Sequence, residues 1–82
     1  DEIGALKDGM ENGWKILNKN GRMSIISFHS VEDREVKNFF RDKSKSGEGK
    51  LINKKPIIPG DQEIDENPRS RSAKLRVIEK IK

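Results

Sequence analysis

The sequence contains no cysteine, and only 30% of its 82 residues are hydrophobic. The absence of cysteine excludes disulfide bonds and thiolate metal sites as sources of stability. A chain of this size buries only about 60–65% of its unfolded surface even when its composition is favourable. We therefore expect a thin core, and we favour a segment that completes a larger sheet over a marginally stable free-standing domain.

Long hydrophobic runs are also absent. No apolar run approaches the roughly 18 residues that a membrane span needs. The first residues, Asp1–Ile3, include neither an initiator methionine nor the basic and hydrophobic regions of a secretory signal. These absences predict a cytoplasmic protein without membrane contact, and they suit an internal start within a longer polypeptide.

Positive charge is concentrated in the second half of the chain. Residues 1–41 carry seven basic and seven acidic side chains, whereas residues 42–82 carry eleven basic and seven acidic ones. All of the net charge of +4 therefore lies in the second half. This indicates contact with a polyanion, although a solvated basic surface explains the charge equally well.

Residues 1–42 predict a helix, a strand and a second helix. Apolar residues recur every three or four positions in the first helix, at Ile3, Leu6, Met10, Trp14 and Leu17. Asn20 or Gly21 suits the left-handed backbone that follows a helix. Met23–Phe28 is nearly continuously apolar, as in a strand covered on both faces of a parallel sheet. Ser30 is the predicted cap of the second helix, which ends near Asp42 and buries Val36, Phe39 and Phe40.

Residues 43–72 predict a loop and an irregular strand, and residues 73–82 predict the final strand. Lys43–Lys50 has no hydrophobic residue and is expected to be a mobile loop. Two prolines confine Leu51–Ile58 to an edge or an irregular path, and Gly60–Pro68 contains about one helical turn. The last segment alternates, with Ala73, Leu75, Val77 and Ile81 on one side and Lys74, Arg76, Lys80 and Lys82 on the other. This pattern predicts a half-buried strand with a basic outer face.

Two stretches of the sequence carry a family resemblance. Ile26–Lys37 reads ISFHSVEDREVK, and Asn67–Arg76 reads NPRSRSAKLR. In this order they resemble the closing segment of the MraW-like methyltransferases, which modify the N4 amine of a cytidine in small-subunit ribosomal RNA. The opening Asp1–Leu6 and the turn Gly21–Arg22 also match, although Asn20 stands where a glycine is common. The resemblance spans nearly the whole chain.

The resemblance implies an α/β fold, the C-terminal part of a class I (Rossmann-like) methyltransferase sheet. Arg22–Phe28 would be one of its parallel strands, and the regions Leu51–Ile58 and Ala73–Ile81 would form an antiparallel pair at its edge. It also implies S-adenosyl-L-methionine as cofactor and ribosomal RNA of the small subunit as partner. No glycine-rich loop joins a strand to a helix in this sequence. We therefore expect the cofactor site to lie mostly upstream, with no cofactor or metal site in this segment, which alone would be inactive.

The end of the predicted strand carries the candidate active-site residues. Ligands of open α/β sheets bind beyond the carboxyl ends of the strands, where Ser27, Phe28 and His29 lie. Phe28 and His29 would stack on or hydrogen-bond to a flipped cytosine, and Ser27 is assigned to substrate binding with them. His29 is the candidate proton acceptor because its ordinary pKa is near neutrality. Two alternatives remain: Phe28 is core and His29 structural, or positioning alone assists the transfer without a base.

A second group of candidates follows the Asn-Pro turn. The predicted RNA contacts are Arg69, Ser70, Arg71, Lys74 and Arg76. Arginine binds phosphate bidentately, and serine hydroxyls add donors. Alternatively, the two turn arginines pair with nearby carboxylates such as Asp65 and Glu66. In the second helix, Glu32 and Asp33 are interpreted as first-turn acids that stabilise the helix dipole, in preference to catalytic carboxylates.

Two further hypotheses follow from the sequence. The chain is alternatively a non-catalytic, basic RNA-binding module that acts by charge. The exposed edges of an incomplete sheet tend to pair with another copy, which predicts a homodimer.

Overall fold

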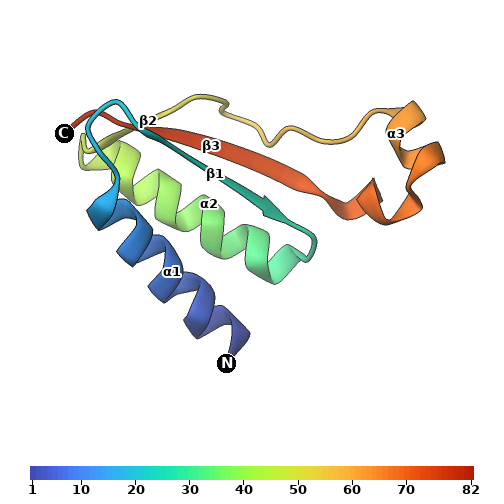
Figure 1. The fold of residues 1–82 in the computed structure, drawn as a ribbon, viewed down its shortest axis with the longest axis horizontal. Coiled ribbons are helices and arrows are strands. Elements are labelled where there is room, and N and C mark those ends of the chain that lie inside the picture. The colour runs from blue at the N-terminus through green and yellow to red at the C-terminus, as the bar shows by residue number, and fades with distance from the viewer.

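Helices and strands alternate along the first part of the chain in the computed structural model, which describes all residues 1–82 (Figure 1). The elements are α1 (Glu2–Ile16), β1 (Arg22–Ser27), α2 (Ser30–Lys45), β2 (Gly49–Leu51), α3 (Asp61–Glu66), the 3-10 helix η1 (Pro68–Ser72) and β3 (Lys74–Lys80). The predicted helix–strand–helix order is confirmed, although the second helix continues beyond Asp42 to Lys45. No helix has the length and hydropathy to cross a membrane.

The three strands form one sheet in the order β1-β3-β2, with β3 antiparallel to both neighbours. The predicted antiparallel pairing of the last two strands is confirmed, but the partner strand is Gly49–Leu51 in place of Leu51–Ile58, and β3 lies in the centre of this sheet and not at its edge. The prediction of a parallel strand covered on both faces is wrong for β1 within this chain. Its exposure alternates, and Ile26 is 57% exposed. The reason is that β1 is an edge strand with helices on one face only.

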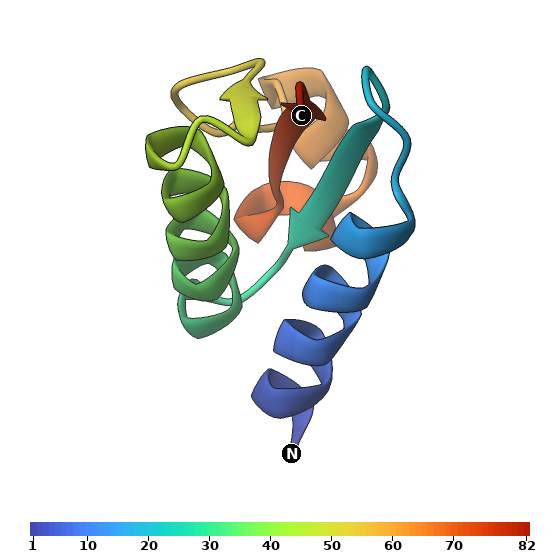
Figure 2. The ribbon, with the colours of Figure 1, turned by 90° about the vertical axis from the view of Figure 1, so that its left-hand side faces the viewer.

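Both long helices lie on the same face of the sheet (Figure 2). The core between helices and sheet consists of Met10, Trp14, Val36, Phe40 and Ile78. Leu6 and Leu17 pack against it, as the helical spacing of α1 predicts. A β-carbon on Gly49 would lie 2.7 Å from Cδ1 of Ile78 and 3.0 Å from Trp14. The small residue in β2 therefore lets the core approach the strand closely.

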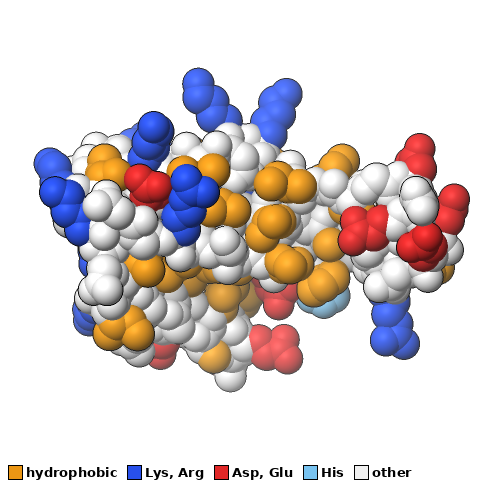
Figure 3. Space-filling model, turned by 45° about the horizontal axis from the view of Figure 1, so that its top comes forward, with side chains coloured by type: hydrophobic (Ala, Val, Ile, Leu, Met, Phe, Trp, Pro, Cys, Tyr) orange, Lys and Arg blue, Asp and Glu red, His pale blue; other side chains and the backbone are white.

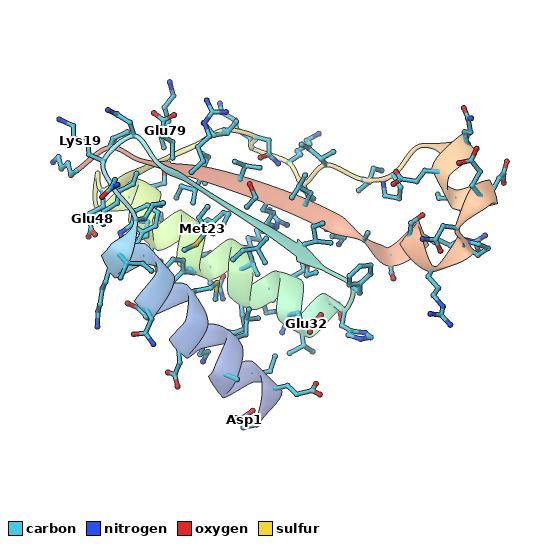
Figure 4. All side chains as sticks on the ribbon, in the orientation of Figure 1. Asp1, Lys19, Met23, Glu32, Glu48 and Glu79 are labelled. Carbon is cyan, nitrogen blue, oxygen red and sulfur yellow. The ribbon has the colours of Figure 1, made fainter.

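The predicted orientation of the last strand is wrong, because its even-numbered residues face the helices. Ile78 is 0% exposed, and Lys80 donates a hydrogen bond from Nζ to the carbonyl oxygen of Trp14 at 2.7 Å. Ile78 anchors this face, while long basic side chains bury their aliphatic stems and find polar partners at the border of the core. Figure 4 shows Met23 of β1 pointing toward the helices and Glu79 of β3 pointing to the opposite face.

The segment predicted as a mobile loop, Lys43–Lys50, is instead the end of α2, a tight turn and the start of β2. Ser46 Oγ lies 3.0 Å from both Glu48 Oε1 and the Lys43 carbonyl oxygen, the two acceptors within reach of its one hydroxyl proton. The Ser46 hydrogen bond, with the charge of Lys43, lowers the pKa of Glu48. Gly47 supplies the left-handed turn at φ 80°. Polar contacts order this turn without any hydrophobic residue.

The predicted irregular path after Leu51 is confirmed. Along it, the side chain of Asn53 replaces part of the backbone hydrogen bonding to β3. Ile57 forms an isolated antiparallel bridge with Leu75. Between β2 and this bridge, the Asn53 side chain hydrogen-bonds to β3 where a paired residue of a regular strand would use its backbone. Its side-chain oxygen accepts from the Val77 N–H at 3.0 Å, and its amide nitrogen donates to the Leu75 carbonyl at 3.3 Å. The edge of β3 therefore stays hydrogen-bonded although Pro56 has no donor.

The face of the sheet away from the helices has an uncovered apolar patch. It has a hollow of about 160 Å³ lined mainly by Ile26, Ile57, Ile58, Pro59, Ala73 and Leu75. Figure 3 shows hydrophobic side chains gathered there, beside the acidic projection that contains α3. Beyond this patch, α3 confirms the helical turn predicted within Gly60–Pro68, and η1 begins at Pro68 of the predicted Asn-Pro turn.

Candidate functional site

Three predicted site residues meet around the carboxylate of Asp33. Arg76 donates from Nε to Oδ1 at 2.8 Å and from Nη2 to Oδ2 at 3.0 Å. Ser27 donates from its hydroxyl to Oδ1 at 3.2 Å, and the ammonium of Lys74 lies 3.7 Å from Oδ2. Strand register produces this meeting, since Ser27 pairs directly with Lys74 and Ile25 with Arg76. The structure thus brings Ser27, Lys74 and Arg76 together on the helix-facing side of the sheet.

Electrostatics keeps this carboxylate ionised. The hydrogen bond from Arg76 is the largest influence lowering the pKa of Asp33, and the charges of Arg76 and Lys74 and the Ser27 hydroxyl lower it further. Burial opposes them by raising the pKa, but the net direction is downward. A carboxylate held in this way is a poor proton acceptor near neutral pH. Its geometry fits a residue that positions cations.

The turn between β1 and α2 consists of Phe28 and His29. Phe28 is 48% exposed in this chain. His29 occupies the N-cap position of α2, is exposed and makes no side-chain cap bond. The prediction that Ser30 caps the helix is wrong, because Ser30 is its first residue. The Glu32 carboxylate instead reaches back and accepts from the Phe28 N–H at 3.3 Å. Figure 4 places Glu32 at the start of α2.

The turn arginines lie apart from the Asp33 cluster, on η1 at the start of β3. Arg69 and Arg71 are exposed, and neither forms an ion pair, so the alternative pairing with Asp65 and Glu66 is absent from the structure. Ser70 between them is buried and donates from Oγ to the Asn67 carbonyl at 2.8 Å. Its hydroxyl holds the turn, while both guanidiniums remain available to solvent.

Sequence reasoning missed the structural role of Asp33. We interpreted it as a helix-dipole acid, yet it is buried and joins α2 to β3. A signal was present, because Asp33 precedes Val36 by three positions and Phe40 by seven, which places all three on the inward face of α2. An acid on an apolar face needs a buried cation as partner, and Arg76 supplies it.

The described side chains form no cluster of metal ligands, and the turn from β1 into α2 contains no glycine. No three His, Cys, Asp or Glu side chains cluster to hold a metal ion. The turn from β1 into α2, at Phe28 and His29, is the single turn from a strand into a long helix, and it contains no glycine. The backbone N–H of Phe28 already donates a hydrogen bond to the Glu32 carboxylate. A close approach of backbone amides to a cofactor therefore does not fit these residues.

Comparison with known proteins gives a consistent result over the whole chain. The model of the MraW methylase family matches residues 1–81. The proteins named ribosomal RNA small subunit methyltransferase H are similar: that of Persephonella marina is 48% identical over 99% of this chain, that of Acetivibrio thermocellus 45% over 99%, and that of Leptospira interrogans 49% over 99%.

The chain spans only a part of those relatives. It covers 28%, 31% and 24% of their respective lengths. The match of the family model to nearly every residue is nevertheless sufficient to assign the family. The chain belongs to the MraW methylase family.

Proposed function

We propose that this chain is the C-terminal, substrate-side part of an S-adenosylmethionine-dependent methyltransferase that modifies the N4 amine of a cytidine in small-subunit ribosomal RNA. The match of the family model to residues 1–81 carries this proposal. The relatives' names specify a small-subunit ribosomal RNA methyltransferase, and this chain spans about a quarter to a third of their lengths. The setting of such a reaction is the cytoplasm.

The bare surfaces of the sheet support incorporation into a larger body. The outer edge of β1 has no strand partner, because the sheet order places β1 at one end. Apolar side chains flank that edge on both faces, with Ile26 on one and Ile25 on the other. A strand edge with apolar side chains above and below it is suited to continue a sheet. In the proposed enzyme, further strands pair there, and helices cover the bare face.

In this proposal, the β1–α2 turn faces the nucleotide. Ser27 shapes the turn through Asp33, exposed Phe28 stacks on the flipped base, and His29 is the candidate proton acceptor. Arg69 and Arg71 contact phosphate, with Ser70 holding their turn. Arg76 acts through Asp33, since both oxygens of that carboxylate engage its guanidinium.

Two measurements test the proposal. Calorimetric titration of S-adenosylmethionine into the 82-residue polypeptide is expected to give no binding heat, since the proposal places the cofactor site upstream of this segment. The gene sequence upstream of Asp1 is expected to encode a glycine-rich strand-to-helix loop, and the polypeptide that includes it to methylate small-subunit RNA. Cofactor binding by the 82 residues alone would overturn the assignment of the cofactor site. Failure of the longer polypeptide to transfer a methyl group to RNA would overturn the proposed activity.

The second candidate is a non-catalytic RNA-binding module, which the net charge of +4 favours. A module of this kind needs neither an apolar strand edge nor a bare apolar sheet face. It would leave RNA unmethylated in the presence of cofactor, whatever polypeptide surrounds it. Methyl transfer by the longer polypeptide, lost on replacing Phe28 with alanine, would therefore exclude this second candidate.

A further inference from the structure

A basic groove lies between α2 and the part of the sheet that contains β3 and the segment after β2. Two adjoining hollows of about 350 Å³ and about 140 Å³ form it, and Lys37 and Arg76 line both. Its cationic side chains are Arg34, Lys37, Arg41, Lys54, Lys74 and Arg76. Those of α2 recur at intervals of three and four residues, which places them on one helical face.

The groove contains one acidic side chain, and its charge is already balanced. Both oxygens of Asp33 accept hydrogen bonds from Arg76, and Lys74 approaches the same carboxylate. Arg41 has only a loose contact with Asp42, at 3.9 Å. The remaining cations face the groove without a carboxylate partner, so the groove has a net positive charge that attracts anions.

The shape of the groove favours a chain of phosphates over a single base. From Ser30 to Arg41 the helix advances roughly 16 Å, at about 1.5 Å per residue, which is long enough for successive phosphates of one strand. Phe40 is the single aromatic residue that lines the groove, and it is 2% exposed. It offers no free ring face on which a base could stack. A strand bound here would therefore be held by its backbone, independently of base sequence.

We propose that this groove binds the phosphodiester backbone of single-stranded RNA, with Arg34 and Lys37 as its principal free cations. The proposal deepens the proposed function and rests on it for the identity of the polyanion. Asp33 is a positioning residue, because it holds Arg76 and Lys74 at the floor of the groove. The groove lies along α2, so it would extend RNA contact beyond the β1–α2 turn and the η1 arginines.

The test compares two charge-matched double variants. Arg34→Gln with Lys37→Gln removes two exposed groove cations that form no ion pair. Lys15→Gln with Lys19→Gln removes two exposed cations outside the groove, and Figure 4 shows Lys19 far from the start of α2 at Glu32. Fluorescence anisotropy measures binding of a labelled single-stranded RNA of about 12 nucleotides between about 50 and 200 mM KCl. Circular dichroism verifies that both variants keep their helices.

The groove variant is expected to bind RNA about tenfold more weakly at low salt than the unmodified chain. Its plot of log K against log salt should flatten by about 1.4, because each phosphate contact on a single strand contributes about 0.7. The control variant should keep the slope. Equal losses in both variants, or no loss in the groove variant, would overturn the proposal.

A measurement without substitution provides a second test. Acetylation of lysine amines, read by mass spectrometry, should slow at Lys37 when RNA is present and remain unchanged at Lys19. An unchanged rate of Lys37 acetylation in the presence of RNA would also overturn the proposal that the groove binds RNA. This result is distinguishable from failure of the proposed function, which is decided by methyl transfer. RNA can occupy the groove of a polypeptide that transfers no methyl group. Conversely, a polypeptide can transfer methyl groups to RNA although its groove does not bind RNA, and each result can be observed separately.

Discussion

The guanidinium of Arg76 donates to both oxygens of the Asp33 carboxylate, at 2.8 Å from Nε and 3.0 Å from Nη2. The two side chains are 12% and 10% exposed. Their contact joins the first turn of α2 to β3 across 43 positions of sequence. The planar fork of arginine matches a carboxylate in this way, which lysine does not reproduce. The pair therefore fixes the helix against the sheet.

Asp33→Asn is expected to lower the free energy of unfolding by about 3 kcal/mol at pH 7, because it leaves Arg76 largely buried without its counter-charge. Urea unfolding followed by circular dichroism measures the change. Asp42→Asn is the matched control on the same helix, since Asp42 is exposed and its ion pair is the loose one with Arg41 at 3.9 Å. Its effect should stay within about 0.5 kcal/mol. Equal effects of the two replacements would contradict a special role for Asp33.

Acid should weaken the fold through the same carboxylate. The folded pKa of Asp33 is lowered, chiefly by the Arg76 hydrogen bond, below the unfolded value of about 3.9. On acidification the unfolded state therefore takes up the proton first. The contribution of Asp33 is fully present above about pH 4 to 5 and is lost as pH falls through the folded pKa. The pKa of Glu48 is lowered in the same direction, but its side chain is 44% exposed and its contribution is screened by solvent.

The measurement is the free energy of unfolding at about pH 6 and about pH 3, in the unmodified chain and in Asp33→Asn. The unmodified chain should lose more stability between the two pH values, because the variant has no carboxylate to protonate at this position. Identical losses would mean that Asp33 does not contribute to the acid dependence.

Periodicity predicted the helices of this fold well, and it failed for the last strand. Met10 and Trp14 are buried as their spacing in α1 predicts, because one apolar face can meet only the core. In β3, apolar residues occur in both phases of the alternation, so the pattern alone does not identify the inner face. Ile78 and Arg76 share the helix-facing side because Asp33 on α2 satisfies the guanidinium. That information lies in a distant element and not in the strand.

Asn53→Ala is expected to cost about 1–2 kcal/mol, because it leaves the Val77 N–H without its partner, whereas the Leu75 carbonyl keeps the Ile57 N–H at 2.8 Å. Amide hydrogen exchange should show loss of protection at Val77 in particular. Asn12→Ala is a suitable control, since Asn12 is exposed on α1 and forms no side-chain hydrogen bond. Undiminished protection at Val77 would show that backbone pairing alone holds this edge.

The left-handed turn after α1 was predictable from residue type. Asn20 has φ 74°, a conformation that glycine adopts freely and asparagine tolerates. Asn20→Gly should leave the urea midpoint nearly unchanged, whereas Asn20→Ala should lower stability by about 1 kcal/mol. Similar midpoints for the two variants would indicate that the turn relaxes away from positive φ.

The outer edge of β1 predicts self-association of the 82-residue polypeptide. This edge has no strand partner, and Ile26 is 57% exposed on the bare face of the sheet. Unpaired strand edges beside apolar side chains pair with other chains, and a charge placed there opposes pairing. Sedimentation velocity should show a concentration-dependent dimer that Ile26→Lys shifts toward monomer. Ile16→Lys is the control, because Ile16 is 83% exposed but ends α1 and does not belong to the sheet. A monomer at every concentration, or equal shifts in both variants, would show that the β1 edge does not mediate dimerisation. Either result would remove one argument for its incorporation into a larger sheet.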